Sequence, residues 1–77
     1  MVTQGMTARD FQEWMARMAF DKHGGTKAAA EALGVTPAMI RRYSSGMGPA
    51  GPVAYPKTLA LACSALAMGL PPWGLKP

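Results

Sequence analysis

The sequence has little that could hold a small fold together covalently. Of its 77 residues only Cys63 is a cysteine, so no disulfide can form within the chain. A lone cysteine is typical of a protein in a reducing compartment. In addition, no group of His, Cys and carboxylate side chains has the spacing of a metal site. A chain this short buries a small core and is only marginally stable alone. Oligomerisation is therefore the expected source of additional stability.

Long apolar runs and leader-like segments are also missing. No apolar run approaches the length of a membrane span, and the first residues lack the basic and then apolar order of a signal peptide. Internal repeats and low-complexity tracts are absent as well. We therefore predict one domain over residues 1–77, in a soluble, cytoplasmic protein that makes no membrane contact.

The residues needed for catalysis are equally scarce. The four carboxylates are scattered along the chain, and the only histidine and the only cysteine, His23 and Cys63, are forty residues apart. An enzyme needs an acid, a base or a nucleophile positioned together in a pocket. We therefore predict that the protein is not an enzyme and that it uses no metal, no cofactor and no small-molecule effector.

Charge is sparse and unevenly distributed. Residues 1–21 carry a net charge of −1, whereas residues 22–77 carry six Lys and Arg against Glu31 alone, which gives +5. A basic portion of this kind suits a polyanion such as nucleic acid. Charge alone leaves open the alternative that the bias is fortuitous in so small a protein.

The pattern of apolar residues predicts helices and no strand, and hence an all-α, compact four- to five-helix bundle. A first helix begins at the capping residues Thr7 and Asp10 and ends at the segment HGG, residues 23–25. Its apolar face is formed by Phe11, Trp14, Met15 and Met18. A second helix, dominated by strong helix formers, runs from about Thr26 to Gly34.

A third helix is predicted directly after Gly34. Threonine is a good N-cap and proline suits the first helical position, so Thr36 and Pro37 begin a helix that runs to about Ser44. Two helices joined by a tight glycine turn, the second one short and basic, are typical of a helix-turn-helix. We therefore predict a helix-turn-helix DNA-binding motif at about residues 26–45.

The third helix is expected to direct its charges away from the core. On a helical wheel, Ile40 and Tyr43 face the core, and the opposite side is formed by Ala38, Arg41, Arg42 and Ser45. Arginine can bind guanine O6 and N7 together, which is the commonest specific base contact in a major groove. We therefore predict base reading by Arg41 and Arg42. The alternatives are phosphate contacts without sequence reading, or a solvated charged face.

The remainder of the chain is predicted to serve dimerisation. Residues 44–56 are rich in Gly and Pro and should form a loop, either functional or a plain connector. A fourth helix, from about Pro56 to Met68, is apolar all round and has to be covered on both sides. We predict a homodimer through this helix and the tail, residues 56–77, with the interface residues Leu59, Leu66, Met68, Leu70 and Trp73. The alternative is a single small core that surrounds the helix.

The segment TKAAAEALGVTPAMIRRYSSG, residues 26–46, resembles the Cro/phage-repressor (Xre-like) helix-turn-helix family. The matching positions are Ala30, the turn Gly34-Val35-Thr36, Ile40, Tyr43 and Gly46. With the flanking helices, the resemblance covers about residues 7–70. The chain looks most like the small anti-CRISPR-associated transcriptional regulators of phages and mobile elements. The features that suggest this are its small size, the RRY sequence and the Gly/Pro loop before YPKTLALACSALA. Those are dimeric repressors of the promoter that drives an anti-CRISPR operon.

The resemblance implies a role for each matching position. The recognition helix begins with Thr36, Pro37 and Ala38. The resemblance places Pro37 and Ala38 near the bases, where Ala38 can contact a thymine methyl group. Phosphate contacts are implied for Thr26, Lys27, Thr36, Ser44 and Ser45, and for the hydroxyl of Tyr43, which is mainly a core residue. The glutamine or serine side chains that often begin a recognition helix are missing here, which shifts base reading toward the two arginines.

The expected function is a sequence-specific transcriptional repressor that binds an inverted-repeat operator in double-stranded DNA as a homodimer. It would autoregulate an anti-CRISPR-type operon in a bacterial or phage-infected host cell. Two alternatives stay open. The first is an antitoxin or a Cro-like switch repressor, which the neighbouring genes would distinguish. The second is a protein-interaction module or inhibitor with a degenerate helix-turn-helix, in which both arginines could be changed to alanine without loss of activity.

Overall fold

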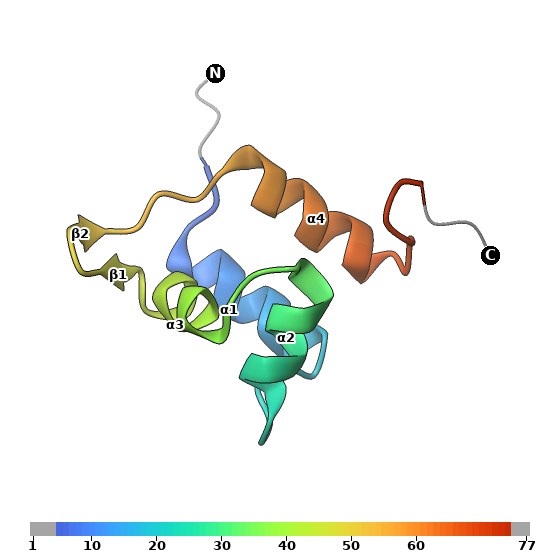
Figure 1. Ribbon diagram of the computed structural model, residues 1–77, viewed down its shortest axis with the longest axis horizontal. Helices are drawn as coiled ribbons and strands as arrows, with labels where there is room; N and C mark the ends of the chain where they lie inside the picture. The colour runs from blue at the N-terminus through green and yellow to red at the C-terminus, as the bar shows by residue number, and fades with distance from the viewer. Residues whose placement is uncertain (1–4, 75–77) are drawn as a thin grey trace.

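The computed structural model describes residues 5–74 as four helices and one two-stranded hairpin. The helices are α1 (Ala8–Arg17), α2 (Gly25–Leu33), α3 (Pro37–Ser45) and α4 (Lys57–Ala67). Between α3 and α4, the strands β1 (Met47–Gly48) and β2 (Gly51–Pro52) pair antiparallel. α1 and α2 each pack against α3 and α4, and the hairpin projects beyond α3 (Figure 1). The fold is mostly helical, with four helices as predicted, and the hairpin is an addition to the predicted all-α bundle.

The start of α1 is fixed by a capping box, as predicted. Thr7 Oγ1 accepts a hydrogen bond from the Asp10 backbone N–H at 3.1 Å, and the Asp10 carboxylate accepts one from the Thr7 N–H at 3.0 Å. Two N–H groups that the helix itself leaves unpaired are thereby satisfied. The predicted apolar face is confirmed as well, since Phe11, Trp14 and Met15 are buried.

The end of α1 differs from the prediction. The helix stops at Arg17, well before the segment 23–25, and residues 18–24 form turns. Ala19 has a φ of +62°, an unusual left-handed conformation for a residue with a side chain. This early turn allows the ring of Phe20 to pack against Trp14, with the ring centroids 5.5 Å apart. A contact between aromatic side chains thus ends the helix earlier than the glycines would.

The boundaries of α2 and α3 are close to the predicted ones. α2 ends at Leu33, and its C-cap Gly34 has a φ of +76°, a conformation that glycine adopts without steric cost. α3 begins after its N-cap Thr36, whose Oγ1 accepts a hydrogen bond from the Met39 N–H at 3.2 Å. Ile40 and Tyr43, with 0% and 6% of their surface exposed, form the predicted inner face of α3.

The core lies where the inner faces of the helices meet. Its largest fully buried side chains are Phe11 and Ile40. The Phe11 ring lies 5.4 Å from that of Trp14 and 5.5 Å from that of Tyr43, measured between centroids, which is a favourable spacing for aromatic pairs. The Trp14 Nε1–H donates a hydrogen bond to the Cys63 carbonyl at 2.9 Å. This bond ties α1 to α4 and satisfies the one polar atom of a buried indole.

The prediction that the chain forms no strand is wrong in one place. Residues 47–52, within the segment predicted to be a loop, form the β1–β2 hairpin. Each strand has only two residues, which is too short for the alternation that marks a strand in a sequence. The Tyr55 hydroxyl donates to the Tyr43 carbonyl at 2.6 Å and holds the returning segment against α3. Burial, and then the neighbouring Tyr43, raises the pKa of Tyr55 above its usual value of 10.0.

Within residues 5–74, α4 is covered by the rest of the chain on one side only. Leu59 is 7% exposed and lies in the core, so the prediction that it forms a dimer contact is wrong. Leu66 is half-buried and also packs against the core. The outer side carries Leu61 and Met68, which are 59% and 74% exposed. A helix that is apolar all round does not reveal from sequence which of its sides meets the core.

The segment after α4 is exposed throughout its described part. Leu70 is 50% exposed, and Trp73 is 103% exposed relative to a free side chain. Both residues belong to the predicted tail, whose last residues, 75–77, lie outside the described range. The described part of the tail therefore presents two further large apolar side chains to solvent.

We expect the Cys63 thiol to be unreactive in the folded protein. The side chain is 3% exposed, and burial raises its pKa from 9.0 to about 11. This shift lowers the thiolate fraction about 100-fold near neutral pH, and the thiolate is the nucleophile. Alkylation by iodoacetamide, followed by mass spectrometry, should be at least that much slower in the native protein than in urea. Equal rates would show that the thiol is accessible beside α1.

Candidate nucleic-acid interface

The outer face of α3 is the candidate site because it carries the two adjacent arginines. The helix is held at several points: Thr36 caps its N-terminus, and Ile40 and Tyr43 anchor its inner face in the core. The Gln12 side-chain amide of α1 donates a hydrogen bond to the Ser44 carbonyl in the last turn. A helix held in this way presents its outer side chains from a fixed backbone, as a recognition surface requires.

The outer face matches the predicted arrangement only in part. Pro37, Arg41 and Ser45 are exposed, whereas Ala38 and Arg42 are half-buried. Helical periodicity predicts the side of a helix on which a residue lies, but it does not predict what approaches that side from elsewhere in the chain. On α3, the hairpin lies against one flank.

The two arginines therefore differ in their surroundings. Arg41 projects into solvent. The Arg42 Nη1–H donates to the Met39 sulfur at 3.4 Å. In addition, the Arg42 Cδ lies 3.7 Å from the position that a Cβ on Gly48 of β1 would occupy. The stem of Arg42 thus lies between its own helix and the hairpin, while Arg41 remains unrestrained by comparison.

Two residues with predicted phosphate contacts have structural tasks. Tyr43 is 6% exposed, and its ring packs against that of Tyr55 with the centroids 5.5 Å apart. Its ring thus belongs to the core and anchors α3, as predicted, and the phosphate contact by its hydroxyl stays a prediction. Ser45 Oγ accepts a hydrogen bond from the Met47 N–H at 3.2 Å and lies 3.3 Å from the Arg42 carbonyl, so it joins α3 to β1.

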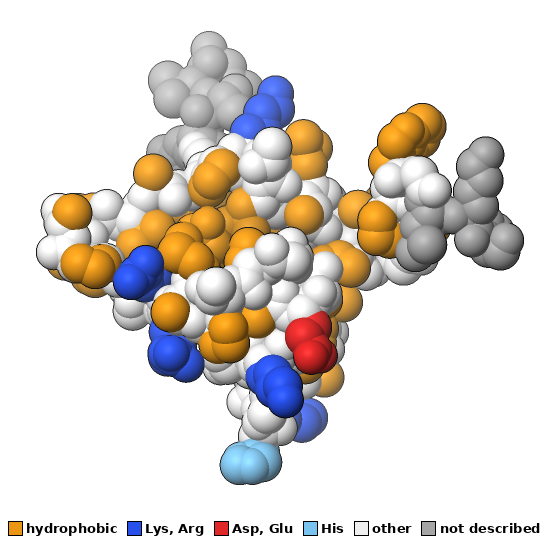
Figure 2. Space-filling view, viewed as in Figure 1, with side chains coloured by type: hydrophobic (Ala, Val, Ile, Leu, Met, Phe, Trp, Pro, Cys, Tyr) orange, Lys and Arg blue, Asp and Glu red, His pale blue; other side chains and the backbone are white. Residues whose placement is uncertain are grey.

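The start of α2 provides a second basic area. Thr26 is half-buried and Lys27 is exposed, both in the first turn. The N-cap is Gly24, and no side chain among residues 5–74 caps the helix. The Gly25 N–H donates to the Lys22 carbonyl, which leaves the N–H groups of Thr26 and Lys27 to bind a partner. Figure 2 shows Lys and Arg side chains over α3 and the lower end of α2, with a small acidic area beside them. Glu31 is the acidic residue of α2.

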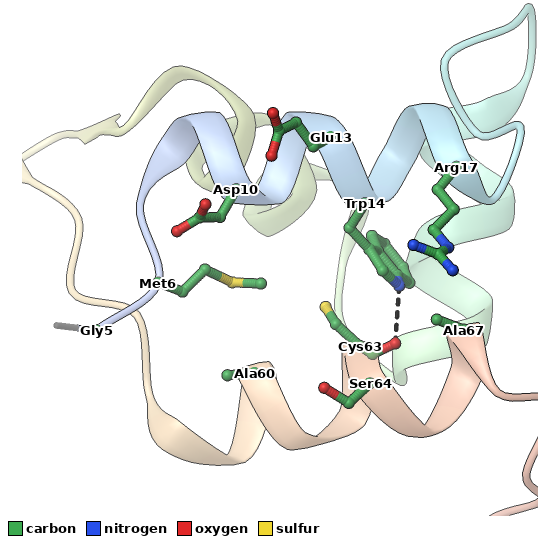
Figure 3. A pocket seen from close by; sticks show the side chains of 10 residues that line it. All are labelled: Gly5, Met6, Asp10, Glu13, Trp14, Arg17, Ala60, Cys63, Ser64 and Ala67. Carbon is green, nitrogen blue, oxygen red and sulfur yellow. Dashed lines mark hydrogen bonds between the residues drawn. The ribbon is translucent and has the colours of Figure 1, made fainter. Parts of the chain in front are cut away.

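A groove of about 700 Å³ separates α1 from α4, and sequence reasoning missed it (Figure 3). Met6, Trp14 and Cys63 form its apolar part, between the two helices. The α1 side adds Asp10, which is already engaged in the capping box, and Glu13. The remaining lining residues are Gly5, Arg17, Ala60, Ser64 and Ala67. The α1 residues that line the groove recur at helical spacing, and this was the only feature of the sequence that placed them on one surface.

The described residues show neither a metal site nor a membrane span. Within residues 5–74, no three His, Cys, Asp or Glu side chains are grouped so that they could hold a metal ion. Over the same range, every helix is too short or too polar to cross a bilayer. Comparison with protein-family models, with curated proteins and with solved structures finds no match to this chain.

Proposed function

We propose that the protein is a sequence-specific DNA-binding repressor in which α2 and α3 form a helix-turn-helix. The observation that carries this proposal is the outer face of α3, where Arg41 and Arg42 stand side by side on a helix without an acidic residue. Their guanidinium groups have the fork geometry that recognises guanine in a major groove. α3 would be the recognition helix, with Pro37 and Ala38 entering the groove first.

The start of α2 supports the same orientation. An uncapped helix N-terminus attracts anions, because its N–H groups and its dipole both point outward. Thr26 and Lys27 lie in that first turn, and α2 packs directly against α3. With α3 in the groove, this N-terminus would contact a phosphate of the adjacent strand. Thr36 and Ser44, at the two ends of α3, are further candidates for phosphate contacts.

We propose that two subunits associate through the outer side of α4 and the segment that follows it. This surface contains the exposed Leu61, Met68, Leu70 and Trp73, whereas the half-buried Leu66, a predicted interface residue, lies on the inner side of α4. A cluster of large exposed apolar side chains is unusual on a monomer. A two-fold symmetric contact would cover it in both subunits. Two recognition helices would then read half-sites of an inverted repeat, spaced about 34 Å apart or a multiple of that distance.

The family that the sequence resembles provides the regulatory setting. A dimer bound across a promoter blocks transcription without a cofactor or a catalytic step. In this setting the protein would repress its own operon, of the anti-CRISPR type, in a phage or a mobile element. This part of the proposal rests on resemblance alone, and the neighbouring genes would separate it from an antitoxin or a Cro-like switch repressor.

We expect the native protein to enrich an inverted repeat from a library of random DNA duplexes. Arg41→Ala/Arg42→Ala should bind the enriched duplex at least about 30-fold more weakly, because the dimer loses a guanine contact worth roughly 1 kcal/mol or more in each of its two half-sites. Fluorescence anisotropy over a salt series measures both the affinity and its salt dependence. Sedimentation of the complex should give two chains per duplex.

The matched control is Arg9→Ala/Arg17→Ala, which removes two exposed arginines from α1. It changes the net charge by the same amount but leaves α3 intact, so its affinity should stay within about threefold of the native value. If no sequence is enriched, or if both double variants bind alike, the repressor proposal fails. The protein-interaction module would then be the hypothesis to test, with the groove between α1 and α4 as its first surface.

A further inference from the structure

The surroundings of Arg41 and Arg42 differ enough to assign them different tasks. We infer that Arg42 reads a base, with its side chain held by Met39 and the β1–β2 hairpin, and that Arg41 contacts a phosphate. The inference rests on the proposed function, since it takes α3 as the recognition helix. It also gives the hairpin a purpose, as a support that positions a specificity-determining side chain.

The hairpin is attached firmly enough to act as such a support. Its entry is fixed by the hydrogen bond from the Met47 N–H to Ser45 Oγ. Its exit is fixed by the Val53 N–H, which donates to the Gly46 carbonyl at 3.0 Å. The Tyr55 hydroxyl then binds the Tyr43 carbonyl of α3. The hairpin therefore moves with the C-terminal turn of α3, which is the turn that carries Arg42.

The stem of Arg42 lies on this support. It passes directly beside Gly48: a Cβ there would lie 3.7 Å from Arg42 Cδ and 3.5 Å from Val53 Cγ2, both ordinary contact distances. At the far end of the side chain, the Met39 sulfur accepts a hydrogen bond from Nη1. Thioether sulfur is a weak acceptor, so it orients the guanidinium without competing strongly with a base. Among residues 5–74, this is the one hydrogen bond of the fork, so its other nitrogens can bind a base.

Pre-organisation is the reason to assign base reading to Arg42. A free arginine loses much rotamer freedom when it adopts one geometry, and a side chain that is already held loses less. Bidentate recognition of guanine needs one geometry, whereas a phosphate accepts a cation from many directions. The held side chain therefore suits the base, and the exposed, unrestrained Arg41 suits the backbone.

Helix geometry also separates the two side chains. Consecutive residues of an α-helix point about 100° apart around the axis. With α3 lying in a groove, two neighbouring arginines cannot both be directed at the same base edge. The stem of Arg42 lies against the hairpin, whereas Arg41 is exposed. In the proposed complex, Arg42 would be directed along the floor of the groove and Arg41 toward its wall.

The test replaces each arginine with lysine, which keeps the charge but lacks the fork. The probe is the duplex enriched by the native protein, together with a set in which each base pair is changed in turn. Arg42→Lys should reduce discrimination at one base pair of each half-site by about tenfold or more. Arg41→Lys should keep discrimination at every position within about threefold, because lysine also serves as a point charge on phosphate.

Two further variants separate positioning from charge. Arg41→Ala should weaken binding to all duplexes alike and reduce the slope of log affinity against log salt by about 0.9 for each phosphate that is no longer neutralised. Met39→Leu keeps the volume but removes the sulfur, and it should reduce discrimination only at the base pair read by Arg42. A merely structural role of Met39 would change the melting temperature and leave the base preference unchanged.

The outcomes are distinguishable from failure of the proposed function. If the native protein shows no sequence preference, the repressor proposal itself fails. If the native preference is present but both lysine variants behave alike, or Arg41→Lys alone abolishes it, only the division of tasks is overturned. Circular dichroism melts show whether each variant retains its fold. A changed base preference in a folded variant can then be attributed to recognition.

Discussion

Replacing Phe11 with alanine should lower the free energy of unfolding by about 3–5 kcal/mol. The side chain is 0% exposed, and its ring lies between those of Trp14 and Tyr43, at 5.4 and 5.5 Å. The substitution removes the transfer free energy of a buried ring and leaves a cavity where α1 meets α3. A native domain is stabilised by only about 5–15 kcal/mol in total, so this one change removes a large share.

Thermal unfolding followed by circular dichroism measures the effect. For a domain of this size each kcal/mol shifts the midpoint by roughly 4–8 °C, so the variant should melt at least about 12 °C below the native protein. The control is Glu31→Ala on α2, where the native side chain is exposed and takes no part in the core. That change should alter stability by about 0.5 kcal/mol or less. Equal effects of the two substitutions would contradict the placement of the core.

The Phe11 substitution should also affect the candidate interface. Tyr43 anchors the inner face of α3, and its ring rests on Phe11. Without the Phe11 ring, α3 is less firmly fixed in its orientation. DNA binding by the fraction that remains folded should therefore show a weaker base preference. Stability and recognition are linked here because the recognition surface is the outer side of a helix whose inner side belongs to the core.

Gly25→Ala should destabilise the protein by about 3 kcal/mol or more. A Cβ on Gly25 would lie 1.8 Å from the carbonyl oxygen of Phe20 and 2.3 Å from its carbonyl carbon. Both are backbone atoms, so no side-chain rotation relieves the overlap. Either the start of α2 or the turn at residues 18–24 has to move, and that turn holds the Phe20 ring against the core. Urea unfolding gives the change in free energy directly.

The neighbouring glycine provides the control. Gly24 has a φ of +81°, but a Cβ there would meet nothing within 4 Å. Gly24→Ala should therefore cost only about 1 kcal/mol, the strain of a left-handed backbone. A cost for Gly25→Ala as small as that for Gly24→Ala would show that the turn yields easily. In that case the close packing of Phe20 would contribute little to the fold.

Local chemistry was sufficient to predict the helices. The capping pair Thr7 and Asp10 marks the start of α1, Gly34 marks the end of α2, and Thr36 marks the start of α3. Each of these signals acts between residues no more than four positions apart, so it can be recognised from a short contiguous segment of the sequence. The inner face of α3 could be predicted for the same reason, since helical periodicity is a local property.

The candidate interface could be located from the sequence, but its organisation could not. Adjacent arginines on the outer side of a short helix follow from the 3.6-residue period alone. That Arg42 is held while Arg41 is free depends on Gly48, which approaches from a hairpin outside the helix. The hairpin itself, with two residues in each strand, carries no periodic pattern from which it could be predicted.

The sequence by itself determined where α2 and α3 begin and end and which side of α3 carries the charge, because caps and periodicity act over a few residues. Only the tertiary structure decided that Phe20 ends α1 early, that Leu59 belongs to the core, and that the groove between α1 and α4 exists. Each of these depends on packing between segments that no local pattern relates. Where α4 is apolar on every side, its neighbours alone select the face that is buried.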